Sequence, residues 1–211
     1  MLTVDRLDRA PHYGPVTQPF DPGYFISPEL RQMGFARVGE NVAISRNCTI
    51  VGLSNITIGD NVRIDGFTSI IAPAGPVRIG SHVQIGIGCV LGARGGIILE
   101  DYSSLSHGVR ILTAVDDFGG GHMTNSTLPP EVLGVQVAPV RIGRFVPVGA
   151  GTLILPGVQI EEGAAVGAMS LVRTSLPGWR IYSGDPLQEM GERSRDLLSL
   201  AERLRAREPH P

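Results

Sequence analysis

Short aliphatic residues recur every six positions through most of this 211-residue chain. The first run is Val38, Ile44 and Ile50, and the longest continues unbroken from Ile142 to Val172. Neither the period of about 3.6 residues of a helix nor the two-residue period of a strand produces this spacing. A six-residue repeat is typical of a parallel β-helix, in which each flat side of a coil points one aliphatic side chain into a continuous core. We therefore predict an all-β solenoid and not a sandwich or barrel, whose turn signals recur about every 8 to 12 residues.

The composition agrees with a solenoid and excludes several functions. The chain has 28 Gly, which suits tight corners, and only 5% aromatic residues, which predicts a narrow core of Ile, Val and Leu. A net charge of −2 argues against a nucleic-acid-binding surface. All 18 basic residues are arginine, so the sequence excludes a Schiff-base lysine and a P-loop lysine.

Cysteine usage and hydropathy bear on the cellular compartment. Cys48 and Cys89 lie inside repeats, at positions that favour small residues, without a Cys or His partner at metal-binding spacing. We predict that both are reduced packing residues of a cytoplasmic protein. The first six residues lack the apolar run of a signal peptide, and no segment approaches the length of a membrane span, so no membrane insertion is expected.

The six-residue repeat divides the chain into segments. Residues 1–34 form an irregular, Pro-rich arm that we expect to cover the first coil, and residues 35–183 form the β-helix. The repeat is interrupted by an excursion loop at 116–139, and a loop of this length is usually functional or disordered. The last segment, 184–211, contains an amphipathic helix that caps the other end or packs on a neighbour; its apolar face is Leu197, Leu200, Ala201 and Leu204.

Three segments carry a resemblance to a known family: residues 149–158, residues 166–172 and Gly184-Asp185-Pro186. They resemble the closing signature of the hexapeptide-repeat acyltransferases, and the similarity covers about residues 35 to 205. The chain looks closest to the galactoside and maltose acetyltransferases and to the sugar acetyltransferases of surface-polysaccharide gene clusters. This resemblance implies a left-handed parallel β-helix, acetyl-CoA as co-substrate without a metal, and a homotrimer. It also implies active sites between neighbouring subunits, with the excursion loop reaching across.

The resemblance also implies which residues bind the co-substrate. By position, the pantetheine arm of acetyl-CoA lies along four small residues of the second block of coils: Gly149, Ala150, Gly167 and Ala168. Glycine and alanine equally suit solenoid corners, so these residues alone do not decide the matter. Three basic residues are candidates for the CoA phosphates, because guanidinium groups match phosphate oxygens: Arg173, Arg180 and Arg193.

The catalytic base departs from the pattern of the galactoside enzymes, which place a histidine where this chain has Asp116. A carboxylate is a poor base for a hydroxyl unless burial raises its pKa. Asp116 itself, His107 or His122 could serve, or the acceptor is an amine, which needs a weaker base. The acid that those enzymes use to hold the sugar is also missing near Arg94, so acceptor binding must differ. Candidate acceptor-binding residues are Arg94, Asp117 and Asn125.

Within the resemblance, residues 113–118 and 123–125 are similar to the subgroup that modifies nucleotide-linked aminosugars. We therefore expect an acetyl-CoA-dependent N-acetyltransferase of surface-polysaccharide (lipopolysaccharide) biosynthesis that transfers the acetyl group directly. Two alternatives stay open, an O-acetyltransferase of a sugar hydroxyl and a non-catalytic β-helix scaffold. A β-helix carbonic anhydrase is disfavoured, because it needs two zinc-binding histidines five residues apart, and the residue five after His107 is Leu112.

Overall fold

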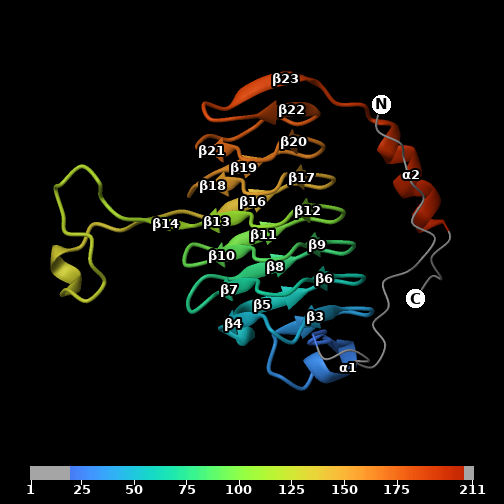
Figure 1. Ribbon diagram of the computed structural model, residues 1–211, viewed down its shortest axis with the longest axis horizontal. Coiled ribbons are helices and arrows are strands. Elements are labelled where there is room, and N and C mark those ends of the chain that lie inside the picture. Colours follow the sequence, from blue (N-terminus) through green and yellow to red (C-terminus); the bar gives the residue numbers. More distant parts are fainter. Residues whose placement is uncertain (1–19, 207–211) are drawn as a thin grey trace.

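The computed structural model describes residues 20–206 and shows a three-sided prism of stacked coils (Figure 1). This is the parallel β-helix that the repeat predicts, with the left hand that the family resemblance implies. Sheet A forms one side with β1 (Tyr24–Ile26), β3 (Ala43–Ser45), β6 (Arg63–Ile64), β9 (Gln84–Ile85), β12 (Ser104–Leu105), β17 (Pro147–Val148), β20 (Ala165–Val166), β22 (Arg180–Ser183) and β23 (Gln188–Glu192). Sheet B contains β2 (Arg37–Val38), β5 (Ile56–Ile58), β8 (Val77–Ile79), β11 (Ile97–Leu99), β16 (Val140–Ile142) and β19 (Gln159–Ile160). Sheet C contains β4 (Thr49–Val51), β7 (Ser69–Ile71), β10 (Val90–Gly92), β13 (Arg110–Leu112), β18 (Leu153–Ile154) and β21 (Leu171–Val172).

The aliphatic repeat builds the core. Along sheet A, Ile64 pairs with Ile85 in the next coil, and along sheet C, Ile70 pairs with Leu91. All four side chains are fully buried. Because equivalent residues stack in register, each side of the prism contributes one continuous aliphatic ladder to the interior, as the sequence predicts.

The chain passes from sheet B to sheet A to sheet C in each coil, and each of the three corners has its own chemistry. At the B–A corner a stack of non-glycine residues adopts positive φ, and their side chains contact one another. His82 stacks on Tyr102 with 4.7 Å between ring centroids, and Tyr102 stacks on Phe145 at 5.1 Å. These ring contacts offset part of the conformational cost of the left-handed backbone.

The interior of the A–C corner holds a ladder of small donors. Thr68 Oγ1 donates a hydrogen bond to the Gly86 carbonyl in the next coil, and Thr152 Oγ1 donates to the Gly167 carbonyl. Cys89 occupies the same position in its coil, and its thiol donates to the Ser106 carbonyl at 3.1 Å. Burial raises the pKa of Cys89 to about 11, and both cysteines are free thiols. Cys89 therefore packs in place of a threonine.

Both ends of sheet A are closed by antiparallel strands. At the first coil, β1 pairs with β3, and Leu30 of helix α1 (Ser27–Leu30) joins the buried core. At the last coil, β23 folds back on β22. The C-terminal helix α2 (Asp196–Arg205) does not close this end; it lies along the side of the prism, where the Arg205 guanidinium is 5.5 Å from the Tyr102 ring centroid. Residues 1–19 of the predicted arm and residues 207–211 lie outside the described part.

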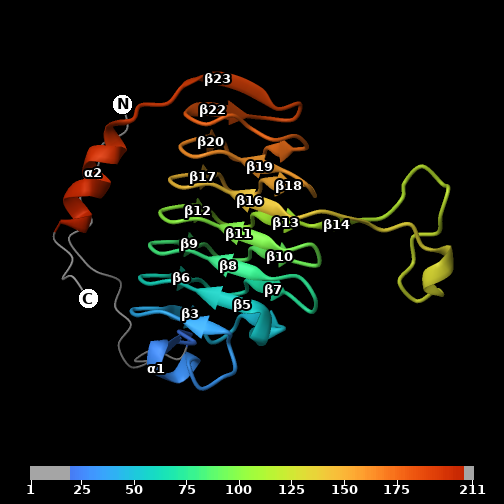
Figure 2. The same ribbon diagram turned by 180° about the vertical axis from the view of Figure 1, so that it is seen from behind.

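The excursion loop leaves the prism at the C–B corner after β13. Its stem is the antiparallel pair β14 (Ala114–Val115) and β15 (Gln136–Val137), and its distal part contains the 3₁₀-helix η2 (Pro130–Val132). A second 3₁₀-helix, η1 (Leu53–Asn55), turns the same corner in the first coil. Figures 1 and 2 show the loop projecting away from the prism, on the side opposite α2. Neither helix within residues 20–206 has the length and apolar character that crossing a bilayer requires.

Candidate active site

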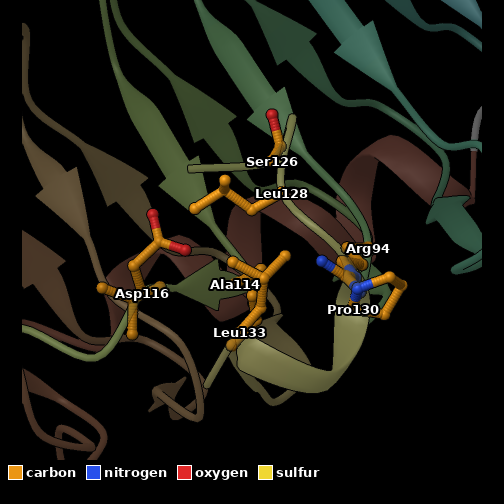
Figure 3. Close-up of a pocket in the computed structure, with 9 residues that line it drawn as sticks. Arg94, Ala114, Asp116, Ser126, Leu128, Pro130 and Leu133 are labelled. Atoms are coloured by element: carbon orange, nitrogen blue, oxygen red, sulfur yellow. The ribbon is translucent and has the colours of Figure 1, made fainter. Parts of the chain in front are cut away.

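A pocket of about 500 Å³ lies where the excursion loop meets its stem. The lining includes Asp116 and Arg94, and Figure 3 shows these two side chains at opposite ends of the labelled group, with Ala114, Leu128 and Leu133 between them. Arg94 forms no ion pair within residues 20–206. The pocket therefore presents a carboxylate and a separate guanidinium, which can bind an amine and an anionic group of one ligand.

Two other candidates of the loop are engaged with each other. The Asp117 carboxylate lies 2.9 Å from His122 Nδ1 and also accepts a hydrogen bond from the Gly119 N–H. These hydrogen bonds, that of His122 foremost, lower the pKa of Asp117. Because an ionised carboxylate only accepts hydrogen bonds, His122 Nδ1 carries a proton, and in the neutral imidazole Nε2 is then the acceptor. Asp117 thus orients His122 and shapes the tip of the loop.

Asn125, the third predicted acceptor-binding residue, closes a local turn. Its Oδ1 accepts hydrogen bonds from both the N–H and the hydroxyl of Thr127, at 3.0 and 2.8 Å. The amide oxygen is occupied by this turn, while the amide nitrogen has no hydrogen bond to any residue in 20–206. The part predicted for Asn125 in acceptor binding stays a prediction.

A second hollow of about 280 Å³, here called the corner groove, lies on sheet A beside the A–C corner. It spans the coils from β9 to β20, and Ser106, His107 and Gly149 are among its lining residues. The sequence singled out His107 and Gly149 separately, and the structure brings them together. Ser106 is a lining residue that the sequence reasoning missed; its position directly before His107 was the available signal.

The four residues predicted along the pantetheine arm stack beside this groove but differ in what fixes them. A Cβ on Gly149 would lie 2.3 Å from the Ala168 nitrogen, and a Cβ on Gly167 would lie 2.4 Å from Ser183 Oγ. Coil stacking therefore explains both glycines. Ala168 is exposed and Ala150 is half-buried, so the alanines are the pair whose small size leaves the outer surface open.

The three predicted phosphate-binding arginines do not gather at the A–C corner. Arg173 follows β21 at the C–B corner and is exposed, and Arg180 forms an ion pair with Glu189 at 2.7 Å. Arg193 Nη1 donates to the carbonyl of Phe145 at 2.6 Å and to those of Gly163 and Ala164. Burial lowers the pKa of Arg193. This side chain ties the C-terminal segment to the B–A corner, and the predicted phosphate contacts remain untested.

Within a single chain the two halves of the candidate site are apart. Asp116 belongs to the loop at the C–B corner, whereas the corner groove borders the A–C corner, on the other edge of sheet C. The loop also projects away from its own prism (Figure 2). Among residues 20–206 no group of three His, Cys, Asp or Glu side chains could hold a metal ion.

Comparison with known proteins identifies the family. The chain is 36% identical over 177 residues to the dTDP-4-amino-4,6-dideoxy-D-glucose acyltransferase of Escherichia coli, and the match covers 84% of this chain and 92% of that protein. The chain is a hexapeptide-repeat acyltransferase. No family model matches the sequence.

Solved structures agree with this assignment. The acyltransferase superposes on AntD, an N-acyltransferase from Bacillus cereus, with a TM-score of 0.81 and 36% identity over 86% of this chain and 95% of that one. That structure holds dTDP and 3-hydroxybutyryl-CoA. A maltose O-acetyltransferase from Clostridium difficile, at 23% identity and a TM-score of 0.54 over 80% of this chain and 74% of that one, shares the fold.

Proposed function

We propose that this acyltransferase transfers an acyl group from a coenzyme A thioester to the amino group of a nucleotide-linked aminosugar. The observation that carries the proposal is Asp116, a carboxylate that lines the loop pocket. The resemblance to the galactoside acetyltransferases, which acylate hydroxyl groups, implies a histidine at this position instead. Two related enzymes support it: the E. coli enzyme is named for a dTDP-linked 4-aminosugar, and AntD has been crystallised with that aminosugar and CoA.

The reaction needs only a weak base from the protein. A neutral amine attacks the thioester carbonyl carbon, the C–N bond forms, the C–S bond breaks, and the products are an amide and the CoA thiol. The amine loses one proton and the departing thiolate gains one. Because a neutral amine is already nucleophilic, a weak base such as Asp116 suffices to accept this proton. His122, which Asp117 orients with Nε2 free, is the competing base.

The AntD structures single out a serine as well as an aspartate. AntD structures exist in which one aspartate, or one serine ten positions before it, is replaced. Ser106 and Asp116 have the same spacing in this chain. Since Ser106 lines the corner groove and Asp116 lines the loop pocket, this spacing supports a single site built from both hollows.

We further propose that the enzyme is a homotrimer in which the loop of one subunit covers the corner groove of the next. The outer face of sheet C supports this, because most of its outward-facing strand residues are apolar: Val51, Ile71, Val90, Leu112, Leu153 and Leu171, with Thr49, Ser69 and Arg110 as the polar ones. Sheet B instead presents Arg37, Arg78 and Arg141. Packing sheet C against a second copy would bury its apolar side chains and join the two halves of the site.

The cellular setting is also a proposal. WbbJ of E. coli K12 is named as a lipopolysaccharide biosynthesis O-acetyl transferase. It is 27% identical to this chain, and the match covers 72% of this chain and 85% of WbbJ. We place this enzyme in surface-polysaccharide biosynthesis in the cytoplasm, where two free thiols such as Cys48 and Cys89 stay reduced. Because WbbJ is named as an O-acetyl transferase, O-acetylation of a sugar hydroxyl is the alternative function for this enzyme.

A paired acceptor assay separates N-acylation from O-acylation. The purified enzyme is incubated with acetyl-CoA or 3-hydroxybutyryl-CoA and with either dTDP-4-amino-4,6-dideoxyglucose or the matching dTDP-sugar that carries a hydroxyl at that carbon. Mass spectrometry is expected to show one added acyl group on the aminosugar alone. Acylation of the hydroxyl sugar alone would establish the alternative.

A further inference from the structure

His107 lies at the A–C corner two residues after the end of β12, and its ring reaches back to the preceding coil. The Ile87 backbone N–H donates a hydrogen bond to His107 Nδ1 at 3.2 Å. Gly86 makes this position possible, because a Cβ there would lie only 3.0 Å from the same nitrogen. The ring is therefore fixed by the backbone of the neighbouring coil.

This contact decides which ring nitrogen carries the proton. A backbone N–H can only donate, so Nδ1 has to be the unprotonated acceptor, and the neutral imidazole bears its hydrogen on Nε2. The opposite holds at His122, whose Nδ1–H faces the Asp117 carboxylate. In this position His107 offers a hydrogen-bond donor and has no free lone pair with which to accept a proton. It is thus unsuited to be the general base.

The donor belongs to the corner groove, one coil in from the end that Gln84 and Gly86 form. His107 and Ser106 line the groove on one side, and Pro147 and Gly149 of the next coil line it further along. The predicted path of the pantetheine arm runs beside Gly149 and Ala150 in that coil and Gly167 and Ala168 in the one after it. A chain lying along those residues ends beside the coil that contains β12, where Ser106 and His107 lie.

We propose, on the basis of the function proposed above, that His107 Nε2–H donates a hydrogen bond to the carbonyl oxygen of the acyl thioester. As the amine nitrogen forms its bond to the carbonyl carbon, negative charge accumulates on that oxygen. A fixed N–H donor stabilises this charge and needs no reorganisation during the reaction. When the C–S bond breaks, the charge leaves with the sulfur, which takes up the proton released by the amine. His107 itself neither gains nor loses a proton.

Two substitutions distinguish a donor from a base. Glutamine places an amide N–H near the position of Nε2 but cannot act as a base, whereas alanine removes both functions. We expect His107→Ala to lower kcat about 10²-fold, the effect of losing one such donor, and His107→Gln to stay within about tenfold of the wild type. The affinity for free CoA, which has no thioester carbonyl, should be unchanged in both variants. The matched control is His82→Asn at the B–A corner. Asparagine fits there, because the equivalent residue one coil earlier is Asn61.

Each outcome bears on the proposal in a defined way. Equal loss of activity in the glutamine and alanine variants, or full activity of His107→Ala, overturns it. A second measurement does not depend on activity: ¹H–¹⁵N correlation spectra of ¹⁵N-histidine-labelled protein should show His107 as the Nε2–H tautomer, and an Nδ1–H tautomer overturns the proposal. Failure of the proposed function reads differently, because the wild type itself would then acylate no aminosugar.

Discussion

Ala168→Trp should block the co-substrate and spare the fold. Ala168 is exposed on the second block of coils, beside a corner groove of about 280 Å³. An indole there would exclude part of the pantetheine arm. If it displaces about 100 Å² of buried arm surface at about 25 cal/mol per Å², CoA binding weakens by about 2.5 kcal/mol, or roughly 70-fold. Because the site is exposed, stability should change by less than about 0.5 kcal/mol, which corresponds to a shift in Tm of about 1 to 2 °C.

Gly149→Ala is the contrasting variant. Its new Cβ would lie 2.3 Å from the Ala168 nitrogen, so the two coils must move apart. Overpacking of this kind costs about 1 to 3 kcal/mol and should lower Tm by about 2 to 12 °C. Isothermal titration with CoA and thermal denaturation of both variants form the assay. Unchanged CoA affinity in Ala168→Trp would show that the groove does not hold the pantetheine arm, and a large loss of Tm in it would show that Ala168 is structural.

Three further predictions concern the base, the assembly and the thiols. Asp116→Asn should lower turnover about 10²- to 10⁴-fold with little change in CoA affinity; near-full activity, together with an inactive His122→Ala, would move the base to His122. Leu153→Arg, on the outer face of sheet C, should convert the trimer to monomers in light scattering, whereas a wild type that is already monomeric contradicts the assembly. Cys89, with a pKa of about 11, is thiolate in about one molecule in a thousand at pH 8, and its thiolate fraction rises with pH. Iodoacetamide should therefore label Cys89 far more slowly in the native protein than in the unfolded protein, and rapid labelling of Cys89 in the native protein would contradict its burial.

The fold was readable from the sequence because a six-residue repeat has few structural solutions. Residues such as Ile64 and Ile85 occupy equivalent positions in successive coils, so the spacing alone indicates that they stack. The interruption at 116–139 likewise indicated a loop. The packing of α2 along the prism was not readable, because the apolar stripe of a helix does not say which surface it meets. Leu200, predicted on its apolar face, is 59% exposed.

The site was readable only in part, since sequence position carries no register across the corners. Glycine at 149 and 167 fitted both a co-substrate groove and a tight corner, and only the distances to the next coil show that the corner requires it. From the sequence, Arg193 was a candidate for the CoA phosphates because of its charge and position. The sequence does not show its three backbone carbonyl partners, which lie 29 to 48 residues away. The tautomer of His107 depends on the Ile87 N–H of another coil, which no local pattern reports.

Mixed trimers test the central claim, that one acyl-transfer site is built from the loop of one subunit and the groove of the next. Asp116→Asn and Ala168→Trp subunits are co-expressed with different tags, and the mixed assemblies are purified and assayed with an acyl-CoA and a nucleotide-linked aminosugar. At an acyl-CoA concentration well below the weakened Kd of the Ala168→Trp subunit, each variant alone should be nearly inactive. In every trimer that contains both variants, one of the three interfaces places an intact groove against an intact loop, so the purified mixed trimers should recover about a third of the wild-type activity. Activity no greater than that of the separate variants would contradict a shared site.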